Sequence, residues 1–326
     1  MKNVVIVESP AKSKTIGKYL GSDFQVVSSK GHIRDLATTG KEGLGVDVDN
    51  NFEVTYAISS EKKKVVKELK TVIKGADQVY LASDPDREGE AIAWSLAEEL
   101  SLDLSHNNRV IFHEITKNAV INAVASPRSI DMDLVKSQET RRILDRVIGF
   151  KLSKLLKKKI KSKSAGRVQS VALKLIVERE REIEKFVPKE YWTIEADFAT
   201  KPPFSAVLSK IAGKKAEIGD ETTAQTIVAD IDDFTVTEIK ESVKKRSAKP
   251  PFITSTLQQE SSTKLGFSAK KTMQIAQKLY EGVQIADDLV GLITYMRSDS
   301  YRLSDVFIME TKNFIKKQYG EKTAHC

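Results

Sequence analysis

Four acidic side chains fall within the seven residues 84–90 (DPDREGE), between an apolar run that predicts a strand and one that predicts a helix. Carboxylates this close repel one another unless a cation holds them. The carboxyl end of a parallel strand is also where α/β folds bind ligands. Asp84, Asp86 and Glu88 therefore predict a site for a hard divalent cation, which prefers oxygen ligands. Glu8 ends another predicted strand and could join them at the same edge.

The same acidic run admits two other interpretations. An EF-hand calcium loop starting at Asp84 would have Gly89 at its sixth position, as required, but its twelfth residue is Ser95 instead of glutamate. The calcium loop is therefore set aside. An acidic turn that caps the following helix stays open, because carboxylates stabilise helix N-termini. Glu90 fits that role better than the other three do.

Lys12 and Lys14 lie just after the predicted start of the first helix, where free backbone N–H groups favour anions. A phosphate could bind there. The sequence has no GxxxxGK[ST] motif, which argues against ATP binding on a Walker loop. His32 lies on a glycine-flanked segment and is a further candidate for phosphate contact.

Tyr295 stands out among the eight tyrosines by its surroundings. It follows a predicted apolar strand, 290–294, and precedes the polar sequence 296–300 (MRSDS). A phenol is a weak nucleophile at neutral pH unless a cation stabilises its anion or a base removes its proton. Arg297 could supply the cation. A half-buried strand tyrosine with no chemical role is the alternative.

The first half of the chain must position these residues, and its pattern predicts an α/β unit with a largely parallel sheet. Strands are predicted at 4–7 and 78–82, each followed by a helical pattern. Ser9 is a predicted N-cap and Pro10 suits the first helical turn. Residues 28–58 lack a clear period and are predicted to form a long surface excursion.

The predicted secondary structure of the second half changes twice along the chain. Residues 133–186 predict helix, with an apolar stripe at Val168, Val171 and Leu175. Alternation at 192–198 then predicts β-strands, and a basic, proline-marked linker at 244–251 announces another domain. Beyond it, Ser255 and Ser268 are predicted N-caps of two helices joined around Gly266, a helix-turn-helix-like arrangement.

Composition narrows the function classes. The chain has 326 residues and a net charge of +8, which divides into −1 for residues 1–150 and +9 for the remainder. The basic half favours a polyanionic partner.

The single cysteine, Cys326, excludes an internal disulfide framework and a CxxC zinc site, and we expect a reducing cytoplasm. No apolar run reaches the ~18 residues of a membrane helix, so neither a membrane span nor a secretory signal is expected.

Five motifs in the chain occur together in one family. They are 7–16 (VESPAKSKTI), 83–90 (SDPDREGE), 164–170 (SAGRVQS), 250–258 (PPFITSTLQ) and 293–300 (ITYMRSDS). In this order they resemble a type IA DNA topoisomerase, and the first resembles the bacterial topoisomerase I branch more than topoisomerase III. The resemblance implies an N-terminal Toprim-like domain whose acidic run binds Mg²⁺.

The resemblance also implies chemical roles. Tyr295 would attack a DNA phosphodiester and become linked to the 5′ phosphate, while Arg297 would stabilise charge on that phosphate. Glu8 matches the family's acid that assists the leaving 3′ hydroxyl, and Lys12 matches a residue that supports the phosphate or the nucleophile. The implied metal ligands are Glu8, Asp84, Asp86 and Glu88.

A further set of residues matches positions at which the family contacts single-stranded DNA: His32, Arg142, Asp145, Phe150, Arg167 and Gln169. The implied function is ATP-independent, magnesium-assisted cleavage and religation that relaxes negative supercoils. The expected partner is single-stranded or negatively supercoiled DNA, bound by a monomer in the nucleoid, with no membrane or nucleotide partner. A phosphotyrosine ester resembles the phosphodiester in energy, so religation needs no nucleotide.

The resemblance predicts four domains along the chain: a Toprim-like metal-binding domain (1–130), a helical DNA-binding domain (131–187), an incomplete β-rich arch segment (188–250) and a truncated tyrosine-bearing domain (251–326). Only 31 residues follow Tyr295, fewer than in the family, and Ser298 stands where threonine is usual. We expect a C-terminally truncated chain that binds metal and DNA but relaxes supercoils poorly alone.

Two alternatives to the enzyme remain open at this stage. An incomplete paralogue or fragment could keep the basic DNA surface without catalysis, as the short tail would favour. A Toprim nuclease or primase is also conceivable, but the motif around Tyr295 argues against it.

Overall fold

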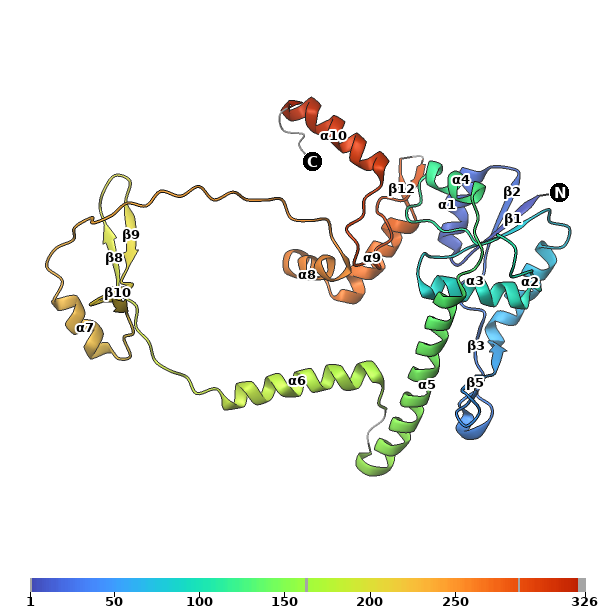
Figure 1. The fold of residues 1–326 in the computed structure, drawn as a ribbon, viewed down its shortest axis with the longest axis horizontal. Coiled ribbons are helices and arrows are strands. Elements are labelled where there is room, and N and C mark those ends of the chain that lie inside the picture. Colours follow the sequence, from blue (N-terminus) through green and yellow to red (C-terminus); the bar gives the residue numbers. More distant parts are fainter. Residues whose placement is uncertain (1, 162–163, 287, 322–326) are drawn as a thin grey trace. The chain divides into compact units, whose positions relative to one another are not determined.

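The computed structural model describes residues 2–161, 164–286 and 288–321. The chain forms two compact units, Met1–Arg167 with Lys249–Cys326, and Val168–Ala248 (Figure 1). The first unit thus joins the N-terminal α/β portion to the segment that carries Tyr295.

The sheet of the first unit has three parallel strands in the order β2-β1-β7. β1 (Asn3–Val7) lies between β2 (Phe24–Ser28) and β7 (Val79–Ala82). Four of the five residues of β1 are buried, as a continuous apolar run predicts for a parallel strand covered on both faces. The expected α/β unit with a parallel sheet is confirmed.

Helices cover both faces of this sheet, because alternate residues of β1 point to opposite sides. Val4 and Ile6 join one apolar core, and Val5 and Val7 join another. The covering helices are α2 (Lys63–Val72) and α3 (Arg87–Glu99) in the first core, and α1 (Pro10–Leu20) and α4 (Lys117–Ala125) in the second.

Helix α1 begins where the sequence predicts. Ser9 is its N-cap, and the Ser9 hydroxyl accepts a hydrogen bond from the Lys12 N–H at 3.2 Å. Pro10 occupies the first turn, where its missing N–H costs nothing. The chain therefore turns directly from the end of β1 into a helix.

Residues 28–58 contain more structure than a surface excursion. Short pairs of strands build a lobe with its own small core of Leu36, Leu44 and Val46. Its strands are two or three residues long, too short for alternation to show in the sequence. The elements are β3 (Arg34–Leu36), η1 (Lys41–Gly43), β4 (Val46–Asp47), β5 (Glu53–Val54), β6 (Tyr56–Ile58) and η2 (Ser60–Lys62).

Two helices occupy the predicted helical region. α5 (Met132–Ile160) buries only Val135 and packs its first turns against α3 (Figure 1). α6 (Arg167–Lys185) buries none of its 19 residues, so its predicted apolar stripe is exposed. No helix in the described part of the chain is long and apolar enough to cross a membrane.

The second unit is small and contains all of α6 except Arg167, followed by a β-rich segment with one further helix. The elements of this segment are β8 (Glu195–Phe198), β9 (Phe204–Val207), β10 (Lys210–Ile211), β11 (Lys214–Lys215) and α7 (Glu221–Ala229). β8 and β9 form an antiparallel pair in which Phe198 stacks on Phe204 at 4.7 Å between ring centroids. The predicted change from helix to strand is confirmed, and the basic linker at 244–251 has no regular structure.

The segment after the linker contains α8 (Thr254–Leu265) and α9 (Ala269–Glu281), joined through Gly266 in the left-handed conformation. Ser268 caps α9 as predicted, but the prediction of Ser255 as a cap is wrong, because α8 begins earlier with Ile253 at the N-cap. The Thr254 hydroxyl donates to the Met296 carbonyl at 2.7 Å, a long-range contact that fixes this earlier start.

The strand predicted at 290–294 is also wrong. β12 (Val283–Ile285) pairs with β13 (Asp288–Val290), and the chain then leaves the hairpin. A side chain at Gly291 would clash with the carbonyls of Tyr280 and Ile115, so the chain passes close beside these two residues. α10 (Asp305–Tyr319) follows.

Candidate active site

Glu8 and Asp84 lie side by side because they follow neighbouring parallel strands. Val7 of β1 is in register with Ala82 of β7, so both chains leave the sheet at the same edge. The Asp84 N–H donates to the Glu8 carboxylate at 3.4 Å. The sequence prediction that Glu8 joins the acidic run is confirmed in position.

The acidic run forms a tight turn into α3. Asp86 caps this helix, with its carboxylate accepting from the Gly89 N–H at 2.8 Å. Gly89 is required here, because an added Cβ would lie 2.1 Å from the Asp84 carbonyl oxygen. The turn therefore combines the helix-capping role with a cluster of carboxylates at the edge.

Arg109 holds this turn in place through hydrogen bonds to its backbone. This residue was not identified from the sequence. Its guanidinium is fully buried and donates to the carbonyl oxygens of Ser83 at 2.9 Å and Asp84 at 2.8 Å. Glu90 compensates its charge at 3.0 Å. The buried Glu90 also accepts from Arg128 at 2.9 Å, so it belongs to the framework and not to the open edge.

Lys12 lies between Glu8 and Asp84 and bonds to both carboxylates. Burial alone would lower the pKa of Lys12, but the two carboxylates outweigh it and raise that pKa. Burial and the neighbouring Glu8 raise the pKa of Asp84 to about 8, while hydrogen bonds and Lys12 keep the pKa of Glu8 below its usual value against the effect of burial.

Tyr295 reaches the acidic edge from the far end of the sequence. Its hydroxyl donates to the Asp86 carboxylate at 2.5 Å, and its backbone N–H donates to the His113 carbonyl at 2.9 Å. Its side chain is largely buried. Burial and the charges of Asp84 and Asp86 raise the pKa of Tyr295, and Arg297 acts in the opposite direction. The Arg297 guanidinium lies 3.8 Å from the Asp86 carboxylate and is mostly exposed.

A cavity of about 750 Å³ opens above these groups. Its acidic lining is Glu8, Asp84, Asp86 and Glu88, and its cationic or polar lining includes His32, Arg141, Gln277 and Arg297. The site therefore presents four carboxylates, three arginines (Arg87, Arg141 and Arg297) and a histidine to one space. The Tyr295 hydroxyl is hydrogen-bonded to one of the lining carboxylates, that of Asp86.

Glu88 is held by two neighbours. Gln138 of α5 donates to its carboxylate at 3.1 Å, and the His32 ring nitrogen lies 3.5 Å away. The hydrogen bond from His32, ahead of the opposing effect of burial, lowers the pKa of Glu88 to about 2. His32, predicted to contact phosphate, thus lines the same cavity as the carboxylates.

Four carboxylates line this cavity, and carboxylate oxygens are the ligands that hard divalent ions such as Mg²⁺ prefer. In the described residues, however, no three acidic or histidine side chains converge closely enough to ligate one ion. The Lys12 ammonium occupies the space between Glu8 and Asp84 instead. Asp86 and Glu88 face the cavity without a lysine between them.

Three of the six residues expected to contact DNA lie on α5, two lie on α6, and His32 lies on a loop. Arg142 pairs with Asp35, Arg167 donates to Asp145 at 2.8 Å, and Phe150 is exposed with Arg146 over its ring at 5.2 Å. Gln169 is an exposed residue of α6 in the second unit. Each predicted arginine is therefore already paired with a carboxylate.

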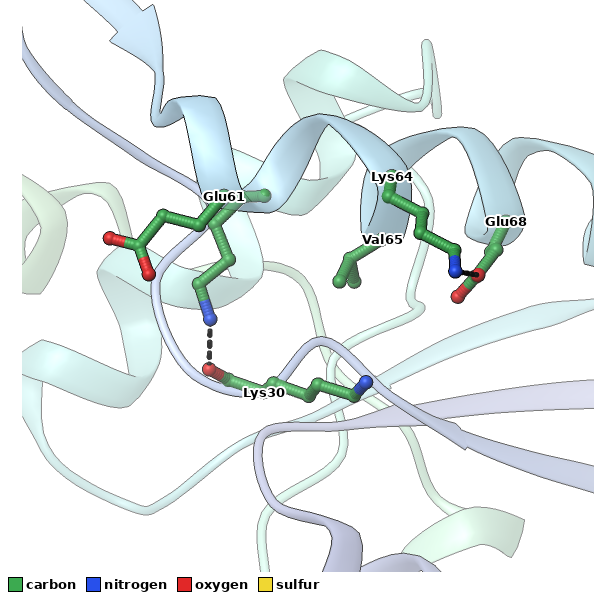
Figure 2. A pocket seen from close by; sticks show the side chains of 6 residues that line it. Lys30, Glu61, Lys64, Val65 and Glu68 are labelled. Atoms are coloured by element: carbon green, nitrogen blue, oxygen red, sulfur yellow. Dashed lines mark hydrogen bonds and ion pairs between the residues drawn. The ribbon is translucent and has the colours of Figure 1, made fainter.

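A second hollow, of about 310 Å³, offers a contrast (Figure 2). Three lysines and two glutamates line it, with Val65, and they largely satisfy one another. Lys62 donates to the Lys30 carbonyl at 2.5 Å, and Lys64 lies 4.0 Å from Glu68. It mixes three lysines with two glutamates and so lacks the four-carboxylate lining of the acidic edge.

Two protein-family models and a solved structure match this chain. Residues 3–115 match the model of the Toprim domain, and residues 129–325 match that of the DNA topoisomerase family. A solved structure of full-length topoisomerase I from Thermotoga maritima is 46% identical, with a TM-score of 0.86 over 98% of this chain.

The two matches together cover most of the chain and define its class, the type IA DNA topoisomerases. The chain belongs to that family, in the bacterial DNA topoisomerase I branch. It spans about half, 53%, of the Thermotoga maritima chain.

Proposed function

We propose that this chain cleaves and rejoins single-stranded DNA through Tyr295. One observation carries the proposal: the Tyr295 hydroxyl is hydrogen-bonded to Asp86 although 209 residues separate them. A half-buried tyrosine without a chemical role would have no reason to meet the carboxylate edge of a Toprim domain. The family membership supports the same conclusion.

In the proposed reaction, the Tyr295 oxygen attacks a backbone phosphorus and forms a bond to the 5′ phosphate, while the bond from phosphorus to the 3′ oxygen breaks. Asp86 is placed to accept the phenol proton. Glu8, at the same cavity, is proposed to assist the departure of the 3′ oxygen as part of the pair it forms with Asp84, and the proton comes from Asp84, the partner with the raised pKa. Arg297 and Lys12 would balance charge that develops on the phosphate. Religation is the reverse transfer, so the number of phosphoester bonds is conserved.

Asp84, Asp86 and Glu88, with Glu8, are the residues proposed to hold Mg²⁺. Bound there, the ion would supply positive charge beside the phosphate oxygens. The chain's own residues would orient the phosphate and move the protons.

Single-stranded DNA is the proposed substrate. Arg142 and Arg167 now bind planar carboxylates in a geometry that a phosphate can also accept. The basic charge of residues 151–326 would add sequence-independent attraction. Relaxation of negative supercoils in a bacterial nucleoid is proposed for the whole protein on the basis of its family.

A labelled oligonucleotide tests this proposal. A single strand labelled at its 3′ end should migrate with the protein after denaturation, because the label stays on the 5′-linked fragment. Tyr295→Phe should abolish the adduct, and Tyr301→Phe, at an exposed tyrosine six residues away, should retain it. An adduct retained by Tyr295→Phe would mean that another residue is the nucleophile. No adduct from the unchanged chain would favour a DNA-binding module.

A further inference from the structure

Tyr280 of α9 is a fully buried tyrosine beside the candidate nucleophile, and it lies outside all five sequence motifs. Its ring meets the Tyr295 ring edge to face, with 5.2 Å between centroids and an interplanar angle of 66°. Aromatic pairs in this geometry attract each other beyond the area they bury. The Tyr280 ring therefore restricts the orientations open to the nucleophile.

The same ring also meets Lys12. The Lys12 ammonium lies 5.2 Å from the Tyr280 ring centroid, while bonding to Glu8 and Asp84. A cation is attracted to the negative face of an aromatic ring, and more strongly when both are shielded from water. An aliphatic side chain of similar volume would not provide that attraction. Lys12 is thus held by two carboxylates and one ring.

The Tyr280 hydroxyl completes a third connection. It donates to the Phe112 carbonyl at 2.6 Å, and the next carbonyl along, that of His113, accepts from the Tyr295 N–H. Two consecutive peptide groups of the Toprim portion are therefore tied to the tyrosine-bearing segment, one through each tyrosine. The hydroxyl secures the position of Tyr280, and the ring contacts the reacting groups.

We propose that Tyr280 is a positioning residue whose ring sets the placement of Tyr295 relative to Lys12, Glu8 and Asp84. This inference rests on the proposed function of Tyr295 as the nucleophile. On this proposal, the ring of Tyr280 affects the rate at which Tyr295 attacks the phosphate, and the hydroxyl of Tyr280 affects the stability of the folded protein. Small displacements of a nucleophile lower reaction rates strongly, because the reacting atoms must approach in line.

Single-turnover adduct formation with the 3′-labelled oligonucleotide separates these contributions. Tyr280→Phe keeps the ring, and we expect its rate constant to stay within about threefold of the unchanged chain, with a lower Tm. Tyr280→Leu removes the ring, and we expect a loss of about tenfold or more in rate. The Kd for the oligonucleotide, measured separately by anisotropy, should change by less than about twofold in both.

The outcomes are distinguishable. A rate for Tyr280→Leu equal to that of the unchanged chain would overturn the inference, as would equal losses in Tyr280→Phe and Tyr280→Leu. If circular dichroism shows that Tyr280→Leu is unfolded, Tyr280→Met, whose longer and more flexible side chain fits irregular space without a ring, decides in the same way. Absence of adduct from the unchanged chain would overturn the proposed function, and this inference with it.

Discussion

Arg142 of α5 binds the carboxylate of Asp35 on β3 through two parallel hydrogen bonds, with 2.8 Å between Nε and the nearer oxygen. The bond joins the helix proposed to grip DNA to the small lobe built on β3–β6. A phosphate and a carboxylate present the same kind of paired oxygens to a guanidinium. DNA that binds Arg142 must therefore displace Asp35 or share the arginine with it.

Replacing Asp35 should strengthen DNA binding. Asp35→Asn removes the competing charge and frees Arg142 for one further phosphate contact, which is worth on the order of 1 kcal/mol, or about fivefold in Kd. Fluorescence anisotropy with a single-stranded oligonucleotide at fixed salt measures this. Asp49→Asn, which removes the same charge from the exposed pair with Lys41, is the matched control. Weaker binding by Asp35→Asn would show instead that Asp35 holds Arg142 in its binding position.

The same pair should affect stability in a pH-dependent way. Burial would raise the pKa of Asp35, but the hydrogen bond and charge of Arg142 outweigh it and lower that pKa. A lowered pKa gives stabilisation that is full above the ordinary carboxyl value of about 4 and is lost as the pH falls through the folded value. The difference in urea midpoint between the unchanged chain and Asp35→Asn should be largest near pH 6 and shrink below about pH 4. A difference that is constant with pH would contradict this.

Gly89 should not tolerate a side chain. Gly89→Ala places a carbon 2.1 Å from the Asp84 carbonyl, and we expect a loss of about 3 kcal/mol in the free energy of unfolding. Gly149→Ala is the control, because its nearest neighbour would be 3.9 Å away and alanine favours the middle of α5 by about 0.5–1 kcal/mol. Denaturant unfolding should therefore give opposite signs for the two variants.

Glu90 should be essential to the framework beneath the acidic run. Glu90→Gln leaves Arg109 buried without a compensating charge, and breaking such a pair costs about 3–5 kcal/mol. Glu98→Gln, on an exposed face of the same helix, should change stability by less than about 0.5 kcal/mol. Similar unfolding midpoints for the two variants would show that Arg109 does not depend on Glu90.

Metal binding should depend on the open side of the acidic edge. Glu88→Gln keeps the size and the Gln138 contact but removes a ligand charge, and we expect about tenfold weaker Mn²⁺ binding by electron paramagnetic resonance. Excess Mg²⁺ should displace the Mn²⁺. Glu68→Gln, in the lysine-lined hollow of Figure 2, should bind as the unchanged chain does. Equal affinities would remove Glu88 from the proposed ligands.

The sequence correctly predicted the elements whose position depends on neighbouring residues in the chain. Ser9 and Pro10 mark the start of α1 because capping depends on the adjacent residues, and the apolar runs predict the strands that bring Glu8 beside Asp84. The sequence-based prediction failed where a contact between residues far apart in the chain sets the start or end of an element. Thr254 begins α8 early because its hydroxyl binds the Met296 carbonyl, and Gly291 leaves the sheet to pack against Ile115.

The site followed the same division. Residue types and spacing predicted the carboxylate cluster, whereas the role of Tyr295 and Arg297 came from the family resemblance. The sequence did not predict that Lys12 bonds to two of those carboxylates. Arg109 and Tyr280 carry no local signal. Arginine in a short apolar stretch and tyrosine on a periodic helix face are ordinary residues until the fold places them beside the site.

The separation of Asp86 and Tyr295 by 209 residues also affects how the protein is made. During synthesis on the ribosome, the Toprim carboxylates emerge long before the phenol, and closing so long a loop is slow. A nascent chain that ends before residue 295 has the carboxylates without the tyrosine. The pair of side chains that carries the proposed chemistry is therefore complete only after residue 295 has been made and has folded back onto the carboxylate edge.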